Sequence, residues 1–261
     1  MSRNVPDFNP FESLPQPQKA PPKVAVAQPV LGRPSPRRAR LGFFDCFFEA
    51  KEFLGKDYWS LWGLTFVGML IAGAVPLIVA GPIYCGLGLC FLAIERRQQP
   101  SFDLMFKGFE QFMNTLVPVL LYFLFTFLVV PFYLVGVFGG MGLCSTGEGV
   151  LVFLGICSIL FGVSVMIIGS TFIGYGAMFA CFLVAEYRLE GMDAFKISLK
   201  GIQMNFFGMF GVMIASLILT FCAMLLCYIP FLLMIPIFTC APFICYRKIF
   251  RAQPEPTKMR L

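Results

Sequence analysis

The sequence contains no histidine among its 261 residues. The chain therefore lacks the most common general base, the usual ligand of zinc and haem, and the histidine partner of a serine or cysteine nucleophile. Its ten cysteines include no pair with C-x-x-C spacing, so no disulfide framework is expected. We predict no catalytic, cofactor-binding or metal site, and a protein that is not an enzyme.

Charged residues are also scarce. Only 13% of the residues are charged and 58% are hydrophobic, whereas about a quarter of residues are charged in soluble proteins. A water-soluble chain of this length could not bury so much apolar surface, so an integral membrane protein is predicted. The net charge of +6 would ordinarily suggest that the protein binds nucleic acid. Because the basic residues flank apolar stretches, we expect anionic membrane lipids instead and no nucleic acid.

Long uncharged stretches alternate with short charged segments. Since a transmembrane helix needs about 20 apolar residues, residues 59–94 and 206–246 are each long enough to cross twice. Turns are expected at Pro76, Gly81 and Pro82 in the first stretch, and at Tyr228, Ile229 and Pro230 in the second. Residues 116–137 and 150–185 are each expected to cross once, separated by a glycine-rich breaker at 139–142. The surplus length of 150–185 is expected to tilt, kink or lie partly re-entrant. The prediction is an all-α polytopic membrane protein with six transmembrane helices.

Lysine and arginine fall on one side of this arrangement. The positive-inside bias counts these residues near the ends of spans, and six crossings place every basic segment and both termini in the cytoplasm. We expect contacts with anionic lipid from the following residues: Arg37, Arg38, Arg40, Arg96, Arg97, Lys107, Arg188, Lys196, Lys200, Arg247 and Lys248.

The two ends of the chain differ from the middle. Residues 1–41 are rich in proline and basic residues and lack the apolar core of a secretory signal, so a disordered cytoplasmic tail is predicted. Residues 42–251 form the predicted membrane domain, and 252–261 a short disordered tail.

Three charged segments show helical periodicity. Ser101 is predicted to cap a helix in which Phe102, Met105 and Phe109 share one face. Asp193 is predicted to cap a second, with Phe195, Leu199 and Ile202 opposite Lys196 and Lys200, and Phe43 to Leu54 follow the same pattern. Such amphipathic helices lie in the membrane interface or pack against the inner ends of the spans, and the sequence leaves both open.

The chain also repeats. A shift of 91 positions superposes residues 90–92 on 181–183, Glu95 on Glu186 and Arg97 on Arg188. With a weaker third copy, the predicted unit is an interfacial helix followed by a two-span hairpin, and three such hairpin repeats give six spans.

Short motifs point to a family. Three segments resemble the first half of uncharacterised multi-pass bacterial proteins related to the membrane domain of glycerophosphodiester phosphodiesterase. They are residues 81–84, Arg96 with Arg97, and residues 100–109. Pro236, Ile237, Tyr246 and Arg247 resemble the closing span of the second half. The resemblance implies a six-helix domain of unassigned function in the bacterial cytoplasmic membrane, with no catalytic residues to carry over.

Two functions remain open. Ionisable residues are nearly absent from the spans, so an ion-coupled pump is not expected. The leading prediction is non-enzymatic membrane organisation or scaffolding with anionic-lipid contacts, with membrane-protein partners or a homo-oligomer. The alternative is a transporter or flippase for a lipid or a small apolar molecule. A solid bundle packed through glycines would favour the first, and a lipid-sized cavity between repeats the second. A lipid-modifying enzyme would need clustered polar groups such as Glu95, Arg96 and Asp103.

Overall fold

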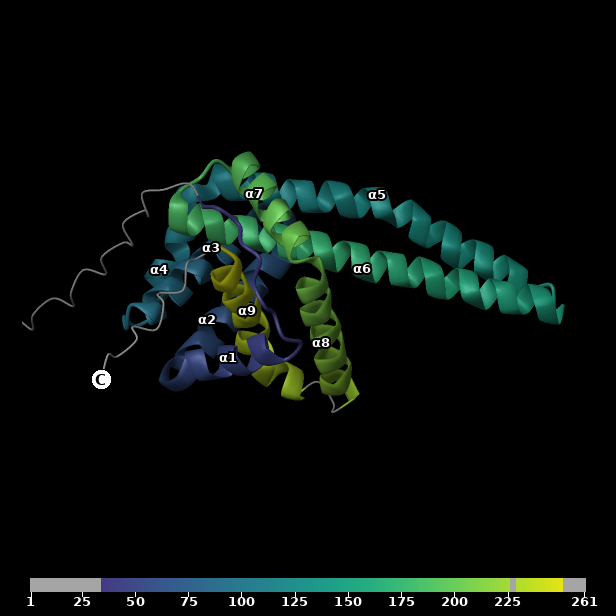
Figure 1. The fold of residues 1–261 in the computed structure, drawn as a ribbon, viewed down its shortest axis with the longest axis horizontal. Coiled ribbons are helices and arrows are strands. Elements are labelled where there is room, and N and C mark those ends of the chain that lie inside the picture. Colours follow the sequence, from purple (N-terminus) through teal and green to yellow (C-terminus); the bar gives the residue numbers. More distant parts are fainter. Residues whose placement is uncertain (1–33, 226–228, 251–261) are drawn as a thin grey trace, which may run out of the picture.

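The computed structural model describes residues 34–225 and 229–250, and all regular elements of this part of the chain are helices, as predicted (Figure 1). Residues 1–33, Tyr228 in the second predicted turn, and 251–261 lie outside the described residues. The elements are α1 (Asp45–Leu54), η1 (Gly55–Asp57), α2 (Tyr58–Ala74), α3 (Pro76–Glu95), α4 (Phe102–Phe106), η2 (Lys107–Gln111), α5 (Phe112–Cys144), α6 (Gly149–Tyr187), α7 (Gly191–Met204), α8 (Phe206–Leu225) and α9 (Ile229–Phe250).

Five helical stretches of the described chain are long and apolar enough to cross a membrane. They are Pro76–Glu95, Phe102–Cys144, Gly149–Tyr187, Phe206–Leu225 and Leu232–Phe250. These lengths are consistent with the predicted membrane protein. Helix α2, with 17 residues, is shorter than these five.

The first predicted hairpin turns at one of its three expected positions. Val75 has a non-helical backbone (φ −138°, ψ 71°) that separates α2 from α3, and Pro76 begins α3. Proline suits this position because its missing N–H would be unpaired in the first turn of a helix anyway. Gly81 and Pro82 do not turn the chain but lie inside α3. A Cβ on Gly81 would lie 2.5 Å from the Thr115 carbonyl oxygen, so this glycine lets α3 approach α5.

Helices α5 and α6 form a long hairpin that extends away from the other helices (Figure 1). The prediction of a breaker at 139–142 is wrong, because α5 runs through these residues to Cys144. The glycines instead let the helices touch: a Cβ on Gly140 would lie 2.5 Å from the Gly155 carbonyl oxygen, and one on Gly136 would lie 2.8 Å from the Cα of Gly162. Gly136 and Gly140 thus serve close helix packing rather than a break in the chain.

The charged segments form helices near the predicted positions. Ser101 caps α4, because its hydroxyl accepts a hydrogen bond from the Leu104 N–H at 3.3 Å. The predicted cap at Asp193 is wrong: α7 begins at Gly191 with Glu190 in the cap position, and Asp193 lies in the first turn. Gly191, the first residue of the helix, packs against the backbone of Asn114, where no side chain would fit.

The core lies where α3, α6 and α9 meet. The Phe243 ring lies 5.1 Å from that of Phe91 and 5.5 Å from that of Phe182, and Tyr246 is fully buried beside them. Aromatic pairs at these separations contribute beyond the area they bury.

The candidate spans do not share one direction. In Figure 1, α8 and α9 run across the line of the α5–α6 hairpin. At the start of α2, Tyr58 and Trp62 donate hydrogen bonds to the carbonyls of Leu233 and Leu232 near the beginning of α9. Helix α3, in contrast, ends beside Arg247 in the last turn of α9. A bundle of parallel spans would not produce this crossing pattern.

Candidate functional site: an apolar cavity

A cavity of about 640 Å³ lies between helices from all three predicted hairpins. Its walls come from α2 and α3, from α5 and α6, and from α9. They comprise Met69, Ala72, Gly73, Pro76, Ala80, Tyr84, Val119, Tyr122, Phe123, Ser170, Thr171, Gly174, Tyr175, Ala177, Met178, Cys181, Phe238 and Pro242. The volume falls within the range of about 300–1,000 Å³ that is usual for small-molecule pockets.

The space exists because small residues line the helices where they face one another. These are Ala72, Gly73, Ala80, Gly174 and Ala177. A Cβ on Gly174 would meet only the Tyr122 ring, at 3.5 Å, which is an ordinary contact distance. The cavity therefore has room beside Gly174, in contrast to the tightly filled positions of Gly81 and Gly140.

The chemistry of the lining is apolar with a few hydroxyl groups. No charged side chain is among the described residues that line the cavity. The polar groups are the phenols of Tyr84, Tyr122 and Tyr175 and the hydroxyls of Ser170 and Thr171. Ser170 donates to the Met166 carbonyl within its own helix at 2.6 Å. Such a lining suits an apolar molecule that carries one or a few groups able to form hydrogen bonds, and it would exclude an ion.

One rim of the cavity lies at the α2–α3 turn. Met69, Gly73 and Pro76 line the cavity and are themselves exposed. Their neighbours Leu70 and Leu77 are 61% and 44% exposed. The rim is thus apolar, as expected for an opening toward lipid rather than toward water.

The ends of several helices meet in a second feature, which we term the charged end. Glu95 pairs with Arg247 at 2.8 Å, and Glu49 with Lys248 at 2.5 Å. The longer contact, at 3.9 Å, joins Glu110 and Arg188. Glu186, only 3% exposed, accepts a 2.6 Å hydrogen bond from the Tyr246 hydroxyl. Each pair joins residues that are distant along the chain, so the sequence alone did not indicate these partners.

The residues predicted to contact anionic lipid divide into two groups. Arg37, Arg38, Arg40, Arg96, Arg97, Arg188, Lys196 and Lys200 are exposed. Lys107, Arg247 and Lys248 are half-buried. Arg247 and Lys248 bind carboxylates, and the Arg247 guanidinium also lies 5.6 Å from the centre of the Phe53 ring. The two last residues are therefore less available to a lipid headgroup than the exposed group is.

Part of the predicted N-terminal tail is fixed to the helices. The Asn205 side chain donates to the Arg37 carbonyl and accepts from the Ala39 N–H, both at 2.7 Å. The Arg37 N–H donates to the Ile249 carbonyl at 2.9 Å. These bonds hold the segment with Arg37, Arg38 and Arg40 beside the end of α9.

The residues considered for a lipid-modifying enzyme are not part of the cavity. Glu95, Arg96 and Asp103 are absent from its lining. Within the described residues, no group of three or more acidic or cysteine side chains is arranged to hold a metal ion.

The cavity and the contact between Cys46 and Cys245, whose sulfurs lie 3.0 Å apart, were not found from the sequence. Both depend on helices that are distant along the chain, and no local pattern marks them. The family resemblance stays a prediction, since no protein-family model, curated protein or solved structure matches this chain.

Proposed function

We propose that this protein binds a lipid or another apolar molecule inside the membrane and serves its passage between the helices. The observation that carries this proposal is the uncharged cavity of about 640 Å³. All three predicted hairpins contribute to its walls, so relative movement of any one of them would change its shape. Because this cavity separates the predicted repeats, it favours the transport alternative over a solid scaffold.

We further propose six spans, formed by α2, α3, α5, α6, α8 and α9, with both termini on the cytoplasmic side of a bacterial inner membrane. The ion pairs of the charged end support this orientation, because they join all four basic segments of the sequence. The hydrogen bonds from Tyr58 and Trp62 to the first turns of α9 oppose it for α2 alone, because they place the start of α2 beside the outer end of α9. Helix α6, with 39 residues, is about 58 Å long at 1.5 Å per residue, compared with a hydrocarbon core of about 30 Å. We propose that α5 and α6 tilt strongly, which agrees with their direction across the shorter α8 and α9.

Two local features support the proposed repeat. Arg97 and Arg188, which superpose in the sequence, both have a left-handed backbone with φ of 57° and 51°. Each follows the end of a helix, α3 or α6, and precedes a charged helical segment. In L-residues this conformation is uncommon, so its occurrence at matching positions favours a common unit over chance agreement.

Membrane organisation with anionic-lipid contacts is the second candidate function. The eight exposed basic residues of the predicted set favour it, because surface lysine and arginine near a membrane are attracted to acidic headgroups. The two proposals differ in where a lipid would bind: in the cavity for passage, or at the exposed cations for organisation.

Filling the cavity tests the leading proposal. A Gly174→Leu substitution adds apolar volume beside Tyr122, where a Cβ makes only an ordinary contact. Gly63→Leu is the matched control, because a Cβ on Gly63 meets nothing within 4 Å and Gly63 does not line the cavity. Native mass spectra of protein extracted from membranes in mild detergent would show whether a lipid-mass adduct is retained.

We expect the adduct in the original protein and in Gly63→Leu, and its loss in Gly174→Leu. Equal adducts in all three proteins would refute binding in the cavity. Loss of the adduct only after the exposed basic residues are replaced by glutamine would favour the second candidate function.

A further inference from the structure

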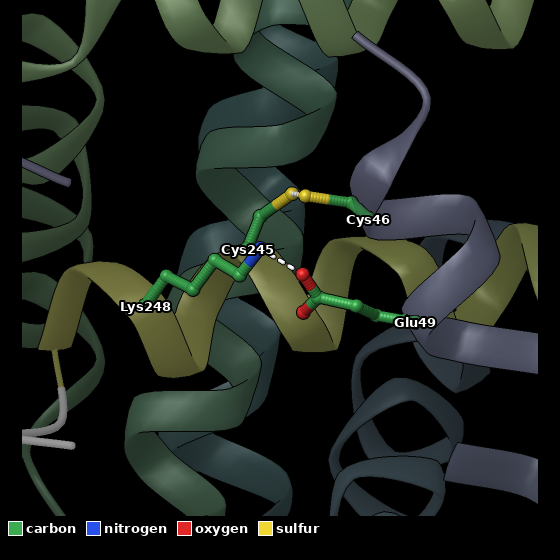
Figure 2. Close-up of polar contacts among 4 residues, drawn as sticks. All are labelled: Cys46, Glu49, Cys245 and Lys248. Atoms are coloured by element: carbon green, nitrogen blue, oxygen red, sulfur yellow. Dashed lines mark hydrogen bonds and ion pairs between the residues drawn. The ribbon is translucent and has the colours of Figure 1, made fainter. Parts of the chain in front are cut away.

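Two thiols from opposite ends of the chain are in contact. Cys46 lies on α1 and Cys245 on α9, 199 positions apart, with their sulfur atoms 3.0 Å from each other (Figure 2). Both residues are fully buried. Among the cysteines that the structure describes, no other pair of thiols is recorded in contact.

Further contacts fix α1 against α9 around this pair. One turn beyond the thiols, the Lys248 ammonium pairs with the Glu49 carboxylate at 2.5 Å (Figure 2). The Phe47 ring packs edge-on against that of Phe238, with centroids 6.0 Å apart. An ion pair on one side and an aromatic contact on the other hold the two sulfurs close together. This lowers the entropic cost of bringing two cysteines into contact before they form a disulfide.

The environment also suits Cys46 for attack. The hydrogen bond from Cys245, followed by the positive charge of Lys248, lowers the pKa of the Cys46 thiol, against the opposing effects of burial and of the charges of Glu49 and Asp45. A thiolate, not a thiol, attacks a disulfide.

We propose that Cys46 and Cys245 are a site of reversible disulfide formation that fastens α1 to α9. The oxidant is a small-molecule disulfide, which reaches Cys46 when α1 separates transiently from α9, since both thiols are buried while the two helices are in contact. The Cys46 thiolate attacks one of its sulfurs, which forms a mixed disulfide and releases one thiolate. The Cys245 thiol loses its proton and attacks the Cys46 sulfur, which releases the second thiolate. Two electrons pass to the oxidant, two protons leave the protein, and a reducing thiol reverses both steps.

The cross-link would stiffen one wall of the cavity. Phe238, which Phe47 contacts, and Pro242 both line the cavity and precede Cys245 on α9. The disulfide site does not depend on the proposed function, however, because its geometry involves α1 and α9 alone.

The experiment treats the full-length protein, in mild detergent, with 2,2′-dipyridyl disulfide, and then blocks free thiols with iodoacetamide. Peptide mass spectrometry is expected to find Cys46 and Cys245 joined in most chains, at two hydrogen masses below the sum of the two peptides. The cross-link should disappear after dithiothreitol and be absent from Cys46→Ser. It should persist in Cys240→Ser, the matched control, since Cys240 is also buried in α9.

Intact-mass measurement must show a monomer, because a cross-link between two chains would contradict the proposal. Separate pyridyl adducts on the two cysteines would also overturn it. So would two unmodified thiols after overnight exposure, because a site of disulfide formation must react.

Discussion

The close approach of α5 and α6 gives a direct prediction about two neighbouring glycines. Gly140 is buried in the hairpin, and a Cβ there would lie 2.5 Å from the Gly155 carbonyl oxygen and 2.6 Å from the Ile159 side chain. Gly139 is exposed, and a Cβ there would meet nothing within 4 Å. The pair therefore separates the cost of a clash from the general effect of replacing glycine in a helix.

Alanine in a helix interior is favoured over glycine by about 0.5–1 kcal/mol, so Gly139→Ala should be neutral or slightly stabilising. Gly140→Ala has the same favourable effect on helix stability, but the added methyl group overpacks the hairpin, which destabilises it by about 1–3 kcal/mol. A backbone oxygen is the nearest atom, and it cannot rotate away as a side chain would. The difference in hairpin opening free energy between the two variants should thus be about 1–3 kcal/mol.

Cys144 reports the opening, because its thiol lies at the hairpin tip and donates to the Val152 carbonyl at 3.7 Å. If opening precedes alkylation, 1–3 kcal/mol corresponds to a roughly five- to 140-fold faster reaction of Cys144 with iodoacetamide in Gly140→Ala than in Gly139→Ala. The exposed Cys222 serves as the internal reference. Equal Cys144 rates in the two variants would mean that α5 and α6 do not touch at Gly140, and the argument from glycine packing would fail.

Three further substitutions test other parts of the structure. Asn205→Ala removes the hydrogen bonds that hold the segment before α1. Trypsin should therefore cleave that segment several-fold faster than it does in the Asn114→Ala control. Unchanged cleavage would show that the segment is not held there. Tyr246→Phe removes a buried 2.6 Å hydrogen bond to a carboxylate and should cost about 1.5–3 kcal/mol of unfolding free energy in a detergent titration, whereas a loss below about 0.5 kcal/mol would contradict the bond. Lys248→Gln removes a positive charge that lowers the pKa of the Cys46 thiol. The pKa of this thiol should therefore rise, its thiolate fraction at pH 7 should fall, and the cross-link should form more slowly. An unchanged rate of cross-linking would contradict this electrostatic effect.

Local signals predicted the helices better than they predicted how the helices meet. Pro76 at a helix start and Ser101 as a cap act on their own backbone, so their positions could be read from the sequence. The glycines at 139–142 were misread because Gly140 packs against Gly155, which lies across the hairpin and is not visible in the local sequence. Asp193 was misplaced as a cap, since α7 already begins at Gly191, whose contact with α5 cannot be read from the local sequence.

The candidate site could not be predicted in this way. Its lining residues, such as Ala80 on α3 and Gly174 on α6, have ordinary small side chains that resemble those used elsewhere for close packing. Whether a small residue leaves a cavity or closes a contact is decided by the partner helix. A Cβ on Gly174 would make only an ordinary contact with Tyr122, whereas one on Gly81 would clash with the backbone of Thr115. Only the assembled structure distinguishes the two cases.

Lipid binding inside the cavity would distinguish a protein that binds individual lipid molecules from one that only contacts lipid headgroups at the membrane surface. Most exposed apolar residues of the α5–α6 hairpin would face acyl chains in either case; Phe127 and Phe161, for example, are 76% and 71% exposed. A useful measurement must therefore distinguish this general contact from occupation of the cavity.

Photo-crosslinking of the full-length protein meets this requirement. The protein is reconstituted in phosphatidylglycerol vesicles that contain a small fraction of the same lipid with a diazirine on one acyl chain, and the labelled peptides are identified after irradiation. If lipid occupies the cavity, we expect adducts at Tyr84, Tyr122 and Tyr175, reduced in Gly174→Leu and unchanged in Gly63→Leu. Adducts confined to outward-facing residues such as Phe127 and Phe161, with the three cavity tyrosines unlabelled, would contradict it.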